Sequence, residues 1–170
     1  MPEVLNRPVP NFDPARSLLK NDHFQMAYVT NDLKQAQAVF RDRFGIENFV
    51  GVEGPTPSGG YIHVELAWSG GIMFELIETS GPGSEFYNER LPAEGFALRH
   101  HHLGYLVWTE ADWQALEAKF EREGWEVVFS ADMEGNMRAR YVDAPELGHY
   151  LEYIFPEAGG LAFFNSVPEG

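Results

Sequence analysis

Two pairs of polar residues lie at the same separation along the chain. Gln25 and His102 are 77 positions apart, and so are Glu75 and Glu152. Together they offer an amide oxygen, an imidazole nitrogen and two carboxylates, a donor set that suits a divalent metal such as Zn, Ni, Co, Mn or Fe. Each residue alone could equally be a surface or structural residue. The repeated spacing is what favours one shared metal site.

The segments that carry these four residues follow the same order twice. Hydrophobic periodicity in each half of the chain predicts one strand, one helix and then three strands. In the first half these elements are expected at residues 23–30, 33–44, 48–53, 61–68 and 72–78. In the second half they are expected at residues 101–108, 111–123, 125–130, 138–143 and 149–155. The fold class predicted is α+β, with two βαβββ modules forming a curved eight-stranded mixed sheet around a metal cleft.

This order divides the chain into a single domain with two flanking segments. Residues 1–21 are expected to form an extended arm and residues 157–170 a tail. The domain at 22–156 consists of a module at 22–79, a linker at 80–99 and a module at 100–156. The linker contains a candidate short helix at residues 85–90.

Strand alternation predicts which side chains face the cleft. It places Gln25, Glu75 and Glu152 on the faces that point away from the two helices. It places Phe24 on the helix side of its strand, and it places His100 on the same face as His102. An isolated carboxylate among apolar neighbours is costly to desolvate, so a cation or a hydrogen-bond donor is expected beside each glutamate.

Composition narrows the classes of partner. The 170 residues include no cysteine, which excludes disulfides and thiolate metal sites. Twelve Lys and Arg against 26 Asp and Glu give a net charge of −14, which disfavours nucleic acid and anionic membrane surfaces as partners. The sequence has no run of about 20 apolar residues and no signal-peptide pattern, so we expect a cytoplasmic protein. A small-molecule substrate is the remaining expectation.

Four segments resemble the vicinal oxygen chelate superfamily, the group of glyoxalases, bleomycin-resistance proteins and dioxygenases. Its opening βα unit is similar to HFQMAYVTNDLKQAQAVFRDRFG, and its ligand-bearing fourth strand to MFELIE. The region between its modules is similar to GSEFYNERLPAEGFALRHHHLGYLVW, and its closing strand to DAPELGHYLEYIFP. The likeness covers about residues 22–156 and implies the same doubled fold, together with a homodimer.

The resemblance implies the same metal ligands as the strand argument: Gln25, Glu75, His102 and Glu152. In this order they are similar to the metal site of eukaryotic-type glyoxalase I. A methylmalonyl-CoA epimerase is expected to have His at position 25 and Gln at position 75, and an extradiol dioxygenase His at position 25. Three positions depart from the glutathione-binding pattern of glyoxalase I, namely Val29, Thr79 and Leu98.

These implications predict a metal-dependent lyase or isomerase that moves a proton on a bidentate, largely apolar or aromatic small molecule, but not on a glutathione adduct. Glu152 is the expected base, with Glu75 as the second candidate. Two alternatives stay open: an Fe(II) extradiol-type dioxygenase, and a metal-free binding or resistance protein. Weaker candidates for contacts with the substrate are Met73, Trp108, Tyr150, His63, His100 and Arg140.

Overall fold

The computed structural model describes residues 5–170. The first module comprises β1 (Asp22–Thr30), α1 (Leu33–Val39), a π-helical turn (Phe40–Phe44), β2 (Val50–Pro55), β3 (Tyr61–Ser69) and β4 (Ile72–Ser80). After α2 (Glu85–Asn88), the second module comprises β5 (Leu98–Leu106), α3 (Glu110–Glu123), β6 (Val127–Met133), β7 (Met137–Ala144) and β8 (His149–Pro156). A last helix, α4, spans Ala158–Ser166. No helix in the described part of the chain is long and apolar enough to cross a membrane.

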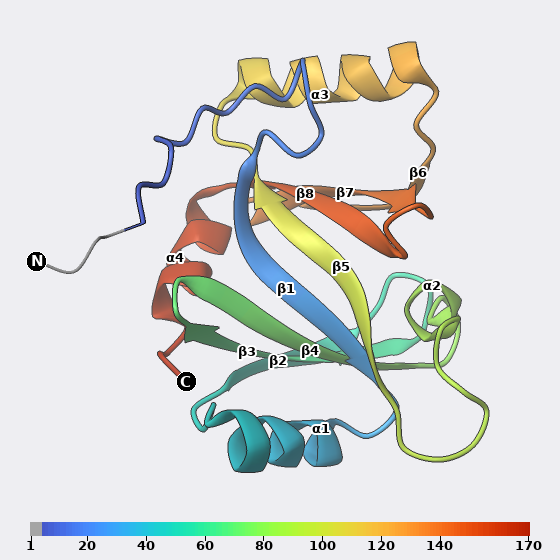
Figure 1. Cartoon of the computed structure of the whole chain (residues 1–170). Coiled ribbons are helices and arrows are strands. Elements are labelled where there is room, and N and C mark those ends of the chain that lie inside the picture. The colour runs from blue at the N-terminus through green and yellow to red at the C-terminus, as the bar shows by residue number, and fades with distance from the viewer. Residues whose placement is uncertain (1–4) are drawn as a thin grey trace, which may run out of the picture.

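All eight strands form one mixed sheet with the order β2-β3-β4-β1-β5-β8-β7-β6. β1 pairs in parallel with β4, β5 pairs in parallel with β8, and the other neighbours are antiparallel. The sheet curls, so that β2, β3 and β4 lie opposite β6, β7 and β8, with β1 and β5 between them (Figure 1). The α+β fold with two βαβββ modules is therefore confirmed.

The internal repeat is visible in the strand register. Ala27 lies opposite Glu75 in the β1–β4 pair, and Gly104 lies opposite Glu152 in the β5–β8 pair. Both members of the second pair lie 77 positions after their counterparts in the first. The two halves therefore present equivalent residues to the middle of the sheet, as the equal spacing predicts.

Helices α1 and α3 cover the outer faces of the sheet (Figure 1). Each begins at a capping side chain: Asp32 accepts a hydrogen bond from the Gln35 amide, and Thr109 accepts one from the Asp112 amide. The apolar residues of α1 pack against β4 around Leu76, and those of α3 form a separate cluster against the outer face of β8. Neither of these two helices covers the inner face of the sheet.

The pairing of β1 with β5 contains two bulges. Phe24 is an extra residue in β1 and His101 is an extra residue in β5, so neither has a partner in the register. A bulge turns two consecutive side chains toward the same side of a sheet. Accordingly Phe24 and Gln25 are both buried, and so are His101 and His102. The prediction that Phe24 faces the helix of its own module, α1, is wrong, because it packs in the cluster on the inner face, against Phe164 of α4.

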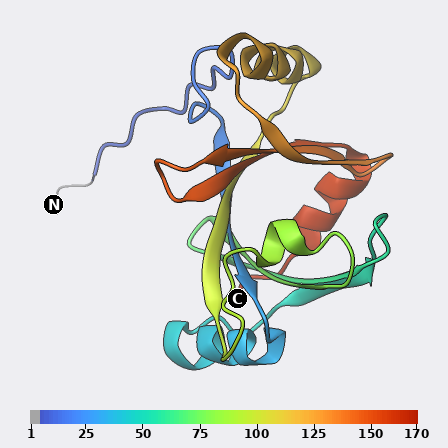
Figure 2. The same ribbon diagram turned by 90° about the vertical axis from the view of Figure 1, so that its right-hand side faces the viewer.

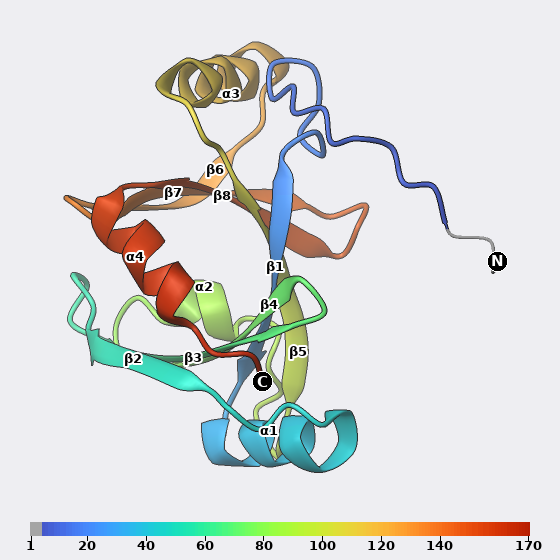
Figure 3. The same ribbon diagram turned by 90° about the vertical axis from the view of Figure 1, so that its left-hand side faces the viewer.

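The inner face is covered by α2 and α4, which lie between the two halves of the curled sheet (Figures 2 and 3). Residues 157–170, expected only as a tail, thus contain a helix that contributes to the core. After α4 the chain runs along β3, where the Trp68 amide donates to the Pro168 carbonyl at 2.8 Å and the Gly170 amide donates to the Trp68 carbonyl at 2.8 Å. The Trp68 indole donates to the Phe164 carbonyl at 3.3 Å.

Candidate metal centre

The four predicted ligands come from the four central strands, one from each. Gln25 is on β1, Glu75 on β4, His102 on β5 and Glu152 on β8. The His102 Nε2 atom lies 3.0 Å from Glu152 Oε2 and 3.2 Å from Glu75 Oε2, so the imidazole touches both carboxylates. Gln25, His102 and Glu152 are 2%, 0% and 3% exposed. The structure therefore brings the imidazole and both carboxylates together, as strand alternation predicts.

Small residues lie between the four candidate ligands in the sheet and let their side chains come close to one another. Ala27 lies between Glu75 and His102 in the sheet, and Gly104 lies between Gln25 and Glu152. A Cβ atom added to Gly104 would lie 2.8 Å from Gln25 Oε1, so the amide group occupies the space that a larger residue would fill.

Two buried atoms of this group lack hydrogen bonds. Among the residues that the structure describes, neither His102 Nε2 nor Gln25 Oε1 has a hydrogen-bond partner. Burial by itself lowers the pKa of His102, but the carboxylates of Glu152 and Glu75, which its Nε2 atom contacts without hydrogen-bond geometry, raise it to about 9. Burial raises the pKa of Glu75. The cluster therefore favours a positive charge between the carboxylates, which a proton or a metal ion can supply.

The donor types fit a divalent cation. Within residues 5–170 no group of three or more His, Asp or Glu side chains is arranged as a ready-made metal site. Nevertheless, an imidazole nitrogen and two carboxylates meet at His102, and these are donor types that would hold a divalent metal. The Gln25 Oε1 atom, which is buried without a hydrogen bond, is the candidate for a fourth donor.

Two tyrosines that sequence reasoning missed border this cluster. Tyr141 lies opposite Glu152 on β7, and its ring stands edge-on to the His102 ring at 5.2 Å. Burial, and then the charge of Glu152, raise the pKa of Tyr141 well above its usual value, so its hydroxyl stays protonated. Tyr87 of α2 stacks on His101 at 5.3 Å. Alternation along β7 could have identified Tyr141, whereas nothing in the local pattern indicates Tyr87.

Two of the weaker candidates line the inner face. Met73 is fully buried, and its sulfur accepts a long hydrogen bond of 3.8 Å from Gln25 Nε2. Tyr150 is also buried and donates a hydrogen bond to Glu89. Burial, and then the contact with Glu89, raise the pKa of Tyr150 to about 12. Both residues contribute to the apolar surroundings of the cluster.

The other four weaker candidates do not point toward the cluster, and a role for them in contacting a substrate stays a prediction. Trp108 follows the end of β5 and is exposed. His63 and Arg140 point to the outer face, because alternation places their neighbours Val64 and Ala139 on the inner one. His100 also faces outward, because the bulge at His101 reverses the alternation. Trp108 donates a hydrogen bond to Asp22, and Arg140 donates one to Asp132. His63 is hydrogen-bonded to Glu65, and the ring of His100 packs against the ring of Tyr28.

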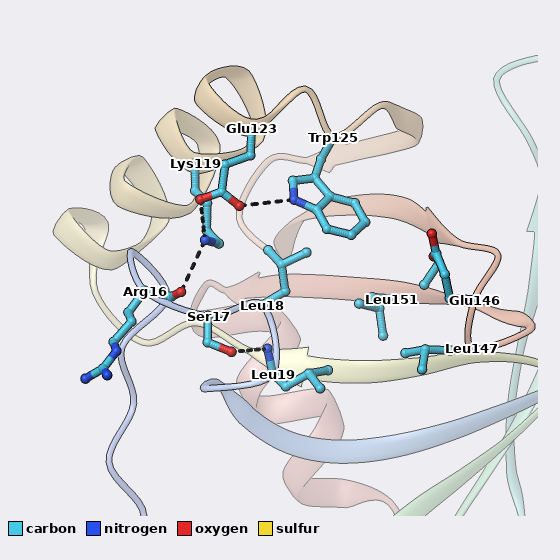
Figure 4. A pocket seen from close by; sticks show the side chains of 11 residues that line it. Arg16, Ser17, Leu18, Leu19, Lys119, Glu123, Trp125, Glu146, Leu147 and Leu151 are labelled. Atoms are coloured by element: carbon cyan, nitrogen blue, oxygen red, sulfur yellow. Dashed lines mark hydrogen bonds and ion pairs between the residues drawn. The ribbon is translucent and has the colours of Figure 1, made fainter.

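A groove of about 320 Å³ lies away from this cluster, on the outer side of the second module (Figure 4). It is bounded by the segment around Leu18, by α3 and by the turn before β8. Lys119 crosses its upper end and donates to the Arg16 carbonyl at 3.2 Å and to Glu123 at 2.6 Å. The groove holds none of the four predicted ligands.

The architecture is that of the vicinal oxygen chelate fold. No model of a protein family matches the sequence, and no curated protein matches it either. Solved structures do match. A methylmalonyl-CoA epimerase from Mycobacterium tuberculosis is similar over 86% of this chain and 94% of its own, with a TM-score of 0.55 and 15% identity.

Two further solved structures are similar in fold to this chain. A methylmalonyl-CoA epimerase in complex with methylmalonyl-CoA and NH4+ is 18% identical, with a TM-score of 0.55 over 81% of this chain and 96% of that chain. A hypothetical protein from Bacillus halodurans is 14% identical, with a TM-score of 0.57 over 81% of this chain and 95% of its own. At these identities the similarity is one of fold.

Replacing Gly104 by Ala is expected to displace Gln25. The new Cβ atom would lie 2.8 Å from Gln25 Oε1 and 2.9 Å from Gln25 Cβ, and the latter cannot swing away. We expect a stability loss of about 1–3 kcal/mol in chemical denaturation and metal binding about tenfold weaker by calorimetry. Gly54→Ala is the matched control, since its added Cβ meets nothing within 4 Å. Equal metal affinity in the two variants would remove Gln25 from the site.

Proposed function

We propose that the chain is a divalent-metal-dependent enzyme of the isomerase or lyase type that moves a proton on a small molecule with two neighbouring oxygens. The observation that carries this proposal is the buried cluster at His102. There an imidazole nitrogen without a hydrogen bond contacts two carboxylates on a face that also carries the unpaired Gln25 oxygen. The fold, shared with epimerases, supports the isomerase class.

In this proposal Gln25, Glu75, His102 and Glu152 hold the metal. When bound, the metal supplies Lewis-acid stabilisation of negative charge that develops on a substrate oxygen. The residues of the chain provide the proton transfer. Glu152 takes the proton from carbon, since a carboxylate at the edge of a site can change position while staying within hydrogen-bond reach. Glu75 is the second candidate for this role.

The surroundings of the cluster indicate an apolar substrate body. Apolar and aromatic side chains of the sheet, α2 and α4 fill the inner face around the cluster. Because Glu152 is almost fully buried, the side chains that cover it must move for a substrate to reach it. A thioester with a neighbouring carboxylate, such as methylmalonyl-CoA, is one suitable chelating substrate, and an α-hydroxyketone is another.

A glutathione adduct is not expected as the substrate. Val29 is fully buried in the core, Thr79 donates its hydroxyl to Asn88 at 3.1 Å, and Leu98 packs on the α1 side of the sheet. None of these three side chains offers a charged group to a peptide carboxylate. Efficient turnover of a glutathione hemithioacetal would contradict this part of the proposal.

We also propose a homodimer, which sedimentation analysis would test.

Metal addition tests the central claim. We expect protein stripped with a chelator to bind one equivalent of Zn, Ni, Co, Mn or Fe. Metal at 100 times its dissociation constant stabilises the folded state by about 2.7 kcal/mol. For a protein of this size the Tm then rises by about 5–10 °C in a thermal scan.

The control for this experiment is His63→Ala, which removes a histidine on the outer face and should bind metal like the parent. Absence of bound metal, with no rise in Tm, would contradict the proposal and favour the metal-free binding protein. Turnover that requires O₂ in anaerobic comparison would instead identify a dioxygenase.

A further inference from the structure

Residues 5–12, which we call the outer arm, carry apolar side chains that their own molecule leaves in solvent. Leu5, Val9 and Phe12 are 78%, 88% and 43% exposed. The outer arm contains no helix or strand and runs away from the body of the molecule (Figures 1 and 3). Exposed apolar side chains gathered on one short segment indicate that the segment contacts another surface.

The sequence of the outer arm keeps it extended. Pro8 and Pro10 fix their own φ angles, and each disfavours the helical region for the residue that precedes it. Residues 5–12 contain no glycine that could reverse the chain. A Pro-rich segment of this kind advances about 3.1 Å per residue, so eight residues span about 25 Å. The outer arm therefore reaches outward and does not fold back.

The groove of about 320 Å³ between α3 and the turn before β8 offers a surface for such a segment. Its apolar lining is formed by Leu18, Leu19, Trp125, Ala144, Leu147 and Leu151 (Figure 4). Leu19 and Leu147 are 55% and 53% exposed, so part of this lining is open to solvent. Extended Pro-rich segments dock in grooves that are lined by aromatic side chains, and Trp125 provides one here.

The polar groups of the groove also fit the outer arm. Lys119 is 6% exposed, and its ammonium donates to the Arg16 carbonyl and to Glu123. An ammonium has three N–H donors, so a third is left for a backbone carbonyl of an extended segment, which makes no internal hydrogen bonds. Arg7 is the only charged residue of the outer arm, and Glu146 is exposed at the groove, so their charges are complementary.

The root of the arm is held at one end of its own groove. Arg122 donates to the Ala15 carbonyl and Lys119 to the Arg16 carbonyl, so both hydrogen bonds fix this part of the chain beside α3. The chain leaves the body beside Arg16, whereas Leu147 lies at the other end of the groove (Figure 4). Because the outer arm is extended and directed away, the groove that it can enter is that of another molecule.

We propose that two copies of this chain exchange their outer arms, so that the apolar side chains of each arm fill the groove of the other copy. Two-fold symmetry then fills both grooves with the same contacts. The exchange rests on the homodimer proposed above and needs neither the metal nor the proton transfer. It identifies the surfaces through which the two copies associate.

Cysteine cross-linking tests the exchange, because the chain contains no cysteine of its own. Val9→Cys protein is co-expressed with Leu147→Cys protein that carries a longer tag, and both are oxidised. We expect a disulfide-linked dimer with one chain of each kind. Phe44→Cys in place of Leu147→Cys is the matched control: Phe44 is 62% exposed but lies in the first module, and the mixed dimer should be at least about tenfold rarer. A double variant Val9→Cys/Leu147→Cys that closes a disulfide within one monomeric chain would overturn the exchange.

Sedimentation over a range of protein concentrations gives the second readout. Val9→Asp and Leu147→Asp should each raise the dissociation constant of the dimer about 10- to 100-fold, since each puts a charge where an aliphatic side chain is buried. Asn11→Asp adds the same charge to the outer arm but keeps its apolar side chains, and should change the constant only a few-fold. A dimer that Val9→Asp leaves unchanged would overturn the exchange while the homodimer stands. A parent chain that stays monomeric at about 100 μM would overturn both.

Discussion

Replacing Glu152 by Gln is expected to slow proton exchange by about 10²- to 10⁴-fold while the protein keeps its fold and most of its bound metal. The substitution preserves the shape of the side chain and one oxygen donor, but an amide cannot accept a proton at neutral pH. Glu152 is almost completely buried beside His102, so water cannot readily take over the role of the carboxylate.

This expectation is measured by deuterium incorporation from D2O, followed by NMR, with methylmalonyl-CoA and hydroxyacetone as probes. The rate of the parent protein with each probe sets the reference. Glu75→Gln is the matched control: it changes a carboxylate of the same cluster that is less buried, and we expect a smaller loss of exchange. Exchange in Glu152→Gln within a few-fold of the parent would mean that another group is the base.

Replacing His102 by Ala is expected to abolish metal binding and to reduce the free energy of unfolding by about 3–5 kcal/mol. The imidazole is fully buried and contacts both Glu75 and Glu152. Without it, two carboxylates remain close together without a cation. Burial raises the pKa of Glu75 and the contact with His102 lowers it, so removing His102 raises the pKa of Glu75 in the folded protein further. The stability deficit should therefore grow between about pH 5 and about pH 6.5, below the range in which the parent loses the stabilisation from its own protonated His102.

Urea denaturation of the metal-free variants at about pH 5 and about pH 6.5 measures this effect. Gln25→Ala is the control, since it removes a neutral side chain, the candidate fourth ligand, from the same cluster. We expect it to weaken metal binding with a smaller loss of stability and little dependence on pH. If His102→Ala unfolds at the same urea concentration as the parent at both pH values, the buried ion pairs contribute nothing to stability and this interpretation is wrong.

Much of the fold was accessible from local patterns. The period of two along β4 and β8 correctly predicts the inward position of Glu75 and Glu152, because alternate side chains of a strand must face opposite sides. The equal spacing of Gln25 and His102, and of Glu75 and Glu152, correctly predicts equivalent registers in the two halves. That these four residues bind a metal, and that Glu152 is the base, remain predictions.

The sequence alone determined the doubled βαβββ order and the strands that carry the candidate ligands, because hydrophobic periodicity is a local property. Only the tertiary structure decided the two bulges, since a bulge depends on how β1 and β5 pair. Because of these bulges, Phe24 faces inward, His100 faces outward and His101 lies against His102. The tertiary structure also decided that α2 and α4 fill the inner face, because a curled sheet cannot leave its apolar side exposed.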